Sequence, residues 1–157
     1  SRVNGIEVSD SEYVDVYANH VDYTGGNGID IRNSYAANVE YNTVHDTDGH
    51  GIAIIHSDDA NVSDNTVYET GKHGIFVHGS DYADIFGNDV HDARWDGINV
   101  EYGRAAYIID NHIGYVGDDG IDVNGNRYVD IKRNTIHDTG LRSRDGNGIE
   151  VSRSAYA

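Results

Sequence analysis

Short runs of alternating apolar and polar residues recur along the chain at a fixed interval. Each run begins with a Gly-Ile pair, and Val or Ile follows two residues after the Ile. The first six pairs start 23 residues apart, and the seventh starts 28 residues after the sixth. Their glycines are Gly5, Gly28, Gly51, Gly74, Gly97, Gly120 and Gly148. A fixed period of this size indicates a solenoid, in which each repeat buries its apolar face against its neighbours.

Each repeat contains three short stretches with strand character. In one repeat, Ile52 and Ile54 predict a first strand with those side chains inward, Ala60 and Val62 a second, and Val67 a third. Three parallel sheets form if the chain coils and each coil hydrogen-bonds to the next, and parallel crossovers are almost always right-handed. We therefore predict an all-β fold: a right-handed, single-stranded parallel β-helix of six full coils plus the start of a seventh, with residues 1–157 as one domain.

An asparagine precedes the third predicted strand of every full repeat. Because Asn tolerates the left-handed backbone conformation, we expect it to occupy the turn between the second and third strands in that conformation. Its amide can then hydrogen-bond the next coil, which predicts a structural asparagine ladder. The residues are Asn19, Asn42, Asn65, Asn88, Asn111 and Asn134.

Other repeat folds fit the pattern less well. A leucine-rich repeat needs several leucines per repeat, and Leu141 is the only leucine in this chain. Residues 25–30 match the GGxGxD motif of the calcium-binding nonapeptide roll once, but the surrounding period is 23 rather than nine. Helical repeats do not fit, because the apolar spacing is two rather than 3.6.

The amino-acid composition limits which classes of binding partner the chain can have. The formal net charge is −16, from 27 acidic and 11 basic residues, which argues against nucleic acid and anionic membrane surfaces. An acidic polymer would need divalent cations to screen the contact. The chain has no cysteine, so neither disulfides nor cysteine metal sites form. No apolar run is long enough for membrane insertion. The chain begins with Ser and stops inside a repeat, so we expect an excised or processed piece of a longer protein.

The repeat, seen best at residues 42–54 (NTVHDTDGHGIAI), resembles the parallel β-helix repeats of carbohydrate-active proteins. It is most similar to the catalytic modules of mannuronan C5-epimerases, with pectate and alginate lyases as more distant relatives. This resemblance implies a secreted module, extracellular or at the cell surface, that binds or modifies an acidic polysaccharide such as alginate or pectate. The alginate epimerases carry an Asp-Pro-His motif, which is absent here because the chain has no proline.

In related β-helix enzymes the active groove crosses the first sheet and its flanking turns, which places candidate chemistry in coils four to six. Removing the proton at C5 of a uronate requires a charge neutraliser, a base and an acid. The candidate catalytic residues are Arg94, His78 and Tyr102. Substrate binding is predicted for His73, Trp95, Asn99 and Glu101, with Trp95 stacking on a sugar face.

Carboxylates in the same region predict a calcium site. Asp96, Asp119 and Asp122 would supply the oxygen ligands that Ca²⁺ prefers. A solvated sheet face carries similar mixtures of polar residues. A non-catalytic glycan or calcium site, and a face with no site, therefore both stay open beside the catalytic interpretation.

Three histidines share one repeat position, and each precedes an aspartate. Alternate coils carry them, so neighbouring members lie about 9.6 Å apart, too far to share one metal ion. We therefore predict a His-Asp hydrogen bond in each turn rather than metal ligation. The histidines are His45, His91 and His137.

The carboxyl-terminal part of the chain differs from the rest. Five extra residues fall between Gly120 and Gly148, and insertions in solenoids often lie on the binding face, although a solvated loop is equally typical. The stretch 150–156 repeats the frame of 7–13, so the last coil of one copy could stack on the first coil of another. A structural module that self-associates end to end through open β-helix edges is therefore the alternative to a glycan-directed one.

Overall fold

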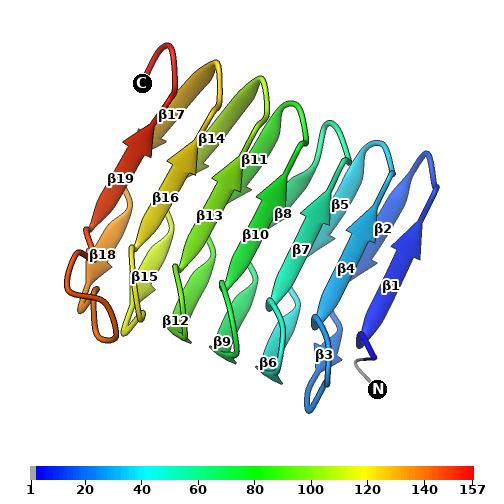
Figure 1. Cartoon of the computed structure of the whole chain (residues 1–157). Coiled ribbons are helices and arrows are strands. Elements are labelled where there is room, and N and C mark those ends of the chain that lie inside the picture. The colour runs from blue at the N-terminus through cyan, green and yellow to red at the C-terminus, as the bar shows by residue number, and fades with distance from the viewer. Residues whose placement is uncertain (1–2) are drawn as a thin grey trace.

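The computed structural model describes residues 3–157 as strands wound into successive coils (Figure 1). The first sheet contains β1 (Ile6–Ser9), β4 (Ile29–Arg32), β7 (Ile52–Ile55), β10 (Ile75–His78), β13 (Ile98–Glu101), β16 (Ile121–Asn124) and β19 (Ile149–Ser152). The second contains β2 (Val14–Tyr17), β5 (Ala37–Glu40), β8 (Asn61–Ser63), β11 (Ala83–Phe86), β14 (Ala105–Ile109) and β17 (Tyr128–Lys132). The third contains β3 (His20–Val21), β6 (Thr43–Thr47), β9 (Thr66–Thr70), β12 (Asp89–Ala93), β15 (His112–Gly114) and β18 (Thr135–His137).

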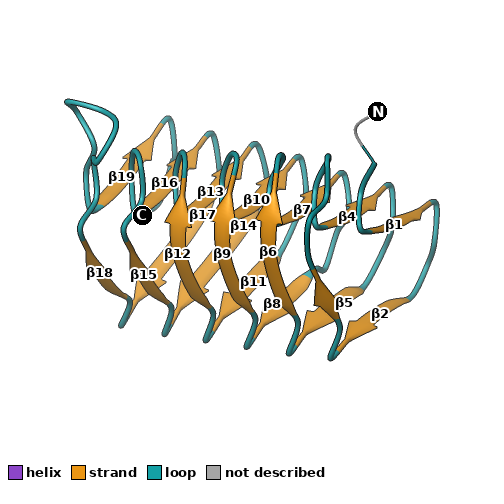
Figure 2. Ribbon diagram, turned by 90° about the horizontal axis from the view of Figure 1, so that it is seen from below, coloured by secondary structure: helices purple, strands orange, loops and turns teal. Residues whose placement is uncertain are grey.

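All pairs of neighbouring strands in these sheets are parallel, which confirms the predicted β-helix. Equivalent residues of successive coils are register partners, as with Ile75, which pairs with Ile98 on one side and Ile52 on the other. The insertion does not disturb this register, because Ile121 pairs directly with Ile149. Its extra residues form a loop that stands out between β18 and β19 (Figure 2). No helix within residues 3–157 has the length and hydropathy to cross a membrane.

The core is a stack of like side chains. The inward isoleucines that begin β4, β7, β10, β13 and β16 are all fully buried, as are the inward valines of the third sheet from β6 to β12. The position before each of these isoleucines has no room for a side chain, so it must be glycine. A Cβ on Gly51 would lie 2.2 Å from Val67 Cγ1 and 2.7 Å from the Gly74 carbonyl oxygen. Any larger residue would therefore force adjacent coils apart.

The turn between the second and third sheets differs from the prediction in one respect. The asparagines are not left-handed; the residue before each of them is, with φ of 55° at Tyr41 and 54° at Asp64. The left-handed residue turns the chain so that the following asparagine side chain points inward, where its amide meets buried backbone groups. The left-handed residues are Ala18, Tyr41, Asp64, Gly87, Asp110 and Arg133.

Each buried asparagine bonds both to the next coil and to the previous one. The backbone N and Nδ2 of Asn42 both donate to Asn65 Oδ1, at 2.9 and 3.0 Å. Asn65 Nδ2 donates in turn to Asn88 Oδ1 at 3.0 Å and to the Val39 carbonyl at 2.9 Å. A serine column serves the turn between the first and second sheets in the same way, with Ser57 N donating to Ser80 Oγ at 2.9 Å. Stacked polar side chains thus satisfy backbone groups that the corners of the coil leave unpaired.

Replacing Asn65 with Ala should lower the free energy of unfolding by about 3 kcal/mol. The substitution removes the side-chain acceptor of the buried Asn42 backbone N–H, and such an unpaired group costs about 1–3 kcal/mol. It also removes the hydrogen bond from Asn65 Nδ2 to the Val39 carbonyl, which adds about 1 kcal/mol. The matched control is Asn61→Ala, since Asn61 Nδ2 bonds only to side chains, those of Asn38 and Glu40. We expect that change to cost less than about 1 kcal/mol. Urea denaturation followed by circular dichroism measures both, and equal losses would contradict this role.

Candidate functional site

Two columns of outward-facing residues run side by side along the first sheet. One comes from the strands and contains Asp30, Phe76, Asn99 and Asp122, and the other comes from the preceding turn and contains His50, His73, Asp96 and Asp119. We call both columns together the first-sheet strip. Side chains of residues three apart in the sequence, one from each column, form hydrogen bonds across the first-sheet strip. Asn99 Nδ2, for example, donates to Asp96 Oδ2 at 3.0 Å and to Asp122 Oδ2 of the next coil at 3.0 Å.

The middle of the first-sheet strip is an aromatic stack. His50 and His73 lie parallel with ring centroids 5.1 Å apart, and Phe76 stacks on His50 at 4.5 Å. Trp95 contacts the edge of His73 at 5.0 Å, with Lys72 Nζ 5.5 Å from the Trp95 ring. Burial lowers the pKa of His50 to about 3, so this ring is neutral at physiological pH. The structure encloses His73 in the stack, whereas Trp95 keeps an exposed face.

Carboxylates gather in the next two coils of the strip. Burial opposes ionisation of Asp96, but its hydrogen bonds from His73 and Asn99 outweigh burial and hold its pKa below the usual value. For Asp122 burial raises the pKa to about 7, and the negative charges of Asp96 and Asp119 act in the same direction. Asp122 therefore exchanges its proton near neutral pH.

The candidate calcium ligands are grouped differently from the sequence-based set. Asp96, Asp118 and Asp119 each place a carboxylate oxygen within 4.8 Å of the others. Asp122 does not belong to this group and reaches Asp96 only through the Asn99 amide. The difference arises because Asp118 and Asp119 lie at the corner of the coil, where consecutive side chains turn toward the same side rather than alternating.

The candidate catalytic residues fall into two places. His78 Nδ1 lies 3.1 Å from Glu101 Oε2, and the His78 and Tyr102 rings meet edge to face at 5.6 Å. Arg94 is not with them, since it precedes β13 and Tyr102 follows it. The four residues of β13 lie between the two positions, a span of about 13 Å. Arg94 instead contributes to a groove on the other side of the turn.

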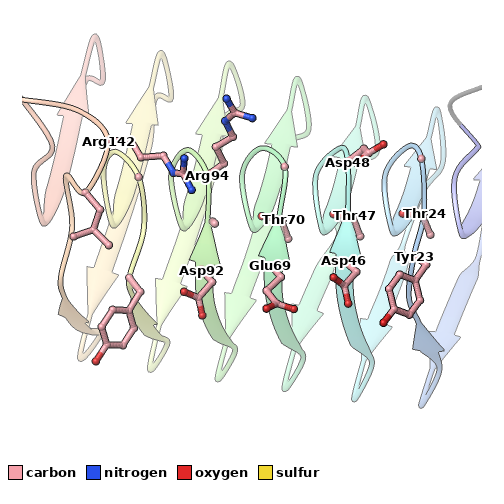
Figure 3. A pocket seen from close by; sticks show the side chains of 16 residues that line it. Tyr23, Thr24, Asp46, Thr47, Asp48, Glu69, Thr70, Asp92, Arg94 and Arg142 are labelled. Atoms are coloured by element: carbon pink, nitrogen blue, oxygen red, sulfur yellow. The ribbon is translucent and has the colours of Figure 1, made fainter.

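That groove runs parallel to the helix axis beside the third sheet and has a volume of about 1010 Å³ (Figure 3). The turn between the third and first sheets separates it from the first-sheet strip. Each coil contributes the residues at the end of its third-sheet strand. The lining residues are Tyr23, Thr24, Gly25, Asp46, Thr47, Asp48, Glu69, Thr70, Gly71, Asp92, Ala93, Arg94, Tyr115, Gly117, Leu141 and Arg142.

The groove has an acidic floor and a basic end. Asp46, Glu69 and Asp92 occupy one repeat position and form a row in Figure 3. Their φ values are 51°, 52° and 54°, so the same left-handed turn aims each side chain into the groove. Arg94 and Arg142 lie at the end near the carboxyl-terminal coils (Figure 3).

The insertion supplies part of this basic end. The backbone N of Arg142 donates to the Gly117 carbonyl at 2.8 Å, which fastens the loop to the corner of the previous coil. Leu141 and Arg142 then line the groove. The insertion thus lies beside a concave surface, as expected for insertions on a binding face.

Sequence reasoning did not find the groove. The sequence-based prediction places the binding surface on the first sheet alone. The signal for the groove is the acidic residue at one position of three successive repeats, Asp46, Glu69 and Asp92. Two of these aspartates were predicted to bond to the preceding histidine, and that is confirmed. His45 Nδ1 lies 2.7 Å from Asp46 Oδ2, and His91 Nδ1 lies 2.8 Å from Asp92 Oδ2.

Comparisons with known proteins agree with this architecture. The family model described as "Right handed beta helix region" matches residues 1–88 and 27–157. Two crystal structures of substituted forms of the periplasmic alginate epimerase AlgG superpose with TM-scores of 0.76 and 0.77, both at 18% sequence identity. They cover 85% and 98% of this chain. The A-module of the Azotobacter vinelandii mannuronan C-5 epimerase AlgE4 gives a TM-score of 0.53 at 18% identity over 82% of this chain.

This chain spans 36%, 42% and 44% of the lengths of those three structures. A comparison with curated proteins finds no match. At this level of identity the likeness extends to the fold, and the chemistry of the site has to be argued from its own residues.

Asp122→Asn should stabilise the protein at high pH and not at low pH. The folded-state pKa of about 7 lies above the unfolded value of about 3.9, so between these values only the folded state holds the proton. Stability therefore falls as pH rises through this window. Because Asp122 is half-buried and screened by solvent, we expect a gain of only about 1 kcal/mol near pH 8.

Thermal unfolding at about pH 4 and about pH 8 measures the difference. Asp15→Asn, at an exposed position on β2, is the control and should change the melting temperature little at either pH. An equal shift for Asp122→Asn at both pH values would show that charge is not the cause.

Proposed function

We propose, from the premise that this chain belongs to the right-handed β-helix family, that it is a polysaccharide-directed module acting outside the cytoplasm. Its ligand is an acidic glycan of the alginate or pectate kind, bound along the groove with Ca²⁺. The similar protein AlgG is a periplasmic alginate epimerase, and this likeness supports both the compartment and the ligand class.

The observation that carries this proposal is the shape and repetition of the groove. The groove is open to solvent and runs along the axis across successive coils. Three successive coils each contribute an acidic residue to it at the same repeat position. A linear polymer lying along the axis would therefore find the same acidic group about every 4.8 Å. Tyr23 and Tyr115 lie toward its two ends and supply the apolar surfaces on which sugar rings pack.

Charge explains why Ca²⁺ is part of the proposal. The row formed by Asp46, Glu69 and Asp92 would repel the carboxylates of a uronate chain. Ca²⁺ takes six to eight oxygen ligands and is satisfied by carboxylates from both sides at once. At the basic end, Arg94 and Arg142 can bind a sugar carboxylate directly through paired guanidinium hydrogen bonds.

Binding of polymannuronate and polygalacturonate should require Ca²⁺ and should depend on the groove. The double variant Glu69→Gln/Asp92→Asn, which removes two ligand charges with little change in shape, should weaken binding at least about tenfold, or 1.4 kcal/mol. Isothermal titration with and without a chelator measures this.

Asp84→Asn, on an exposed position of β11 in the second sheet, is the matched control and should bind as the parent does. Equal binding by the double variant would place the ligand elsewhere. Absence of binding at every Ca²⁺ concentration would contradict the proposal. It would leave the structural module that stacks end to end, which stays a prediction.

The second candidate function is proton chemistry at C5 of a uronate, by epimerisation or elimination. The observation in its favour is the cluster of His78, Glu101 and Tyr102. The carboxylate of Glu101 orients the ring through Nδ1, which leaves Nε2 to accept a proton while the Tyr102 hydroxyl can donate one. Arg94 lies too far from this cluster to neutralise the same sugar carboxylate, so Ca²⁺ would take that role.

Incubation with polymannuronate and polygalacturonate tests this chemistry. Proton NMR detects epimerisation, and ultraviolet absorbance detects the unsaturated product of elimination. We expect His78→Gln or Tyr102→Phe to reduce turnover about a hundredfold or more, with Tyr82→Phe, an exposed tyrosine elsewhere, as the control. Binding without any turnover would eliminate the catalytic candidate and leave the binding function intact.

A further inference from the structure

Two histidine pairs of the same geometry lie on the outer face of the third sheet. In each pair the first histidine is the first residue of a strand, and the second lies 25 residues later, in the next coil. His20 and His45 come from β3 and β6, and their Nε2 atoms are 3.3 Å apart. His112 and His137 come from β15 and β18, with Nε2 atoms 3.2 Å apart. The strands that carry the two pairs lie toward opposite ends of the sheet (Figure 1).

Carboxylates determine which nitrogen of each ring carries the proton. Asp138 Oδ2 lies 2.9 Å from Nδ1 of His137, and Asp89 Oδ1 lies 3.1 Å from Nδ1 of His112. An ionised carboxylate only accepts hydrogen bonds, so both Nδ1 atoms are donors, and each neutral ring then has its lone pair on Nε2. The two Nε2 atoms of this pair therefore face each other as two acceptors. Such a contact is stable only with a cation between them, either a proton added to one ring or a metal ion.

The first pair has this carboxylate contact on one of its two rings, that of His45, and adds a third candidate ligand. Asp46 holds His45 Nδ1 at 2.7 Å and so exposes the Nε2 lone pair, an arrangement that commonly orients histidines that bind metals. Asp22 Oδ2 lies 3.8 Å from His20 Nε2, and His20, Asp22 and His45 can each place a ligand atom within 4.8 Å of the others. At the position of Asp22 the second pair has Gly114, which supplies no side-chain ligand.

The separation of the ring nitrogens fits a tetrahedral ion without rearrangement. Zinc–nitrogen bonds of about 2.0–2.1 Å place two tetrahedral ligands about 3.3 Å apart, which matches the distance between His20 and His45. Imidazole nitrogen favours zinc, copper and nickel over calcium. The side chains of His20 and Asp22 are 62% and 42% exposed, and that of His45 is 13% exposed. The fourth position of the ion thus faces solvent.

We propose that His20, Asp22 and His45 form a binding site for a divalent transition-metal ion, with zinc as the probe, and that His112 and His137 form a weaker two-ligand site. None of these proposed ligands belongs to the row of Asp46, Glu69 and Asp92, although Asp46 contacts His45. Metal binding is measured without any glycan, so its outcome is separate from that of glycan binding. The sequence predicts that His45 and His137 are not ligands, because histidines at the same repeat position lie too far apart to share an ion. The pairing is instead diagonal, with histidines at a different position of the preceding coil.

The chain contains its own negative control. His91 has the same contact to an aspartate, with Nδ1 2.8 Å from Asp92 Oδ2. The residue 25 positions earlier is Thr66, so His91 has no second imidazole at that place. Its ring stacks on Tyr68 at 5.0 Å.

Competition with a chromophoric zinc chelator, in a buffer free of phosphate, tests the proposal on the whole chain. We expect one tighter and one weaker zinc ion per chain. His20→Gln should weaken the tighter site at least about tenfold. Asp46→Asn, which changes the partner of His45 Nδ1 and removes no proposed zinc ligand, should weaken it by about tenfold. His91→Gln should leave both sites unchanged. Circular dichroism confirms that each variant is folded.

Nitrogen NMR of the imidazoles distinguishes a metal from a proton. Zinc should shift the Nε2 resonances of His20 and His45 and leave their Nδ1 resonances nearly unchanged. Nε2 resonances that respond to pH but not to zinc would show that a proton occupies the contact and would overturn the proposal. So would a zinc affinity that His20→Gln and His91→Gln reduce equally.

Discussion

The hydrogen bonds between successive coils are the interaction on which the rest of this structure depends. The backbone of each coil bonds to the coil 23 residues later, as Ile52 N does to the Gly74 carbonyl at 2.9 Å. This constraint forces equivalent residues into register, so side chains of one repeat position form a column along the axis. The core, the buried asparagines, the first-sheet strip and the acidic row of the groove are all such columns. The residues at one repeat position therefore lie in a line along the axis, and in the groove three of them in succession are acidic.

The corners of the coil are where the constraint is most demanding. Three changes of direction in 23 residues require left-handed residues, stacked polar side chains and a glycine with no room for Cβ. Left-handed residues also occur inside strands of the third sheet, where Asp46 of β6 and Glu69 of β9 aim their side chains into the groove. The same left-handed conformation thus serves both the corners and the groove. The acidic row is consequently held on rigid backbone rather than on a mobile loop.

The sequence predicts the fold well because the fold depends on periodic spacing. Ile52, Ile54, Ala60, Val62 and Val67 are inward as their alternation indicates. Alternation does not describe corners, and there the predictions were less accurate. The asparagines are not left-handed, Asp118 rather than Asp122 joins the carboxylate cluster, and Arg94 lies apart from His78. The diagonal contact between His20 and His45 combines a coil step with a shift of two residues, which no column of equivalent positions contains.

The proposed glycan binding rests on the column of acidic residues along the groove rather than on any single residue. The most direct measurement is a crystal structure with a short uronate oligomer and Ca²⁺. The sugar chain should lie parallel to the helix axis over Asp46, Glu69 and Asp92, with calcium between protein and sugar carboxylates. An oligomer bound across the first sheet near His78 and Tyr102, with the groove left to solvent, would contradict the placement of the polysaccharide in the groove.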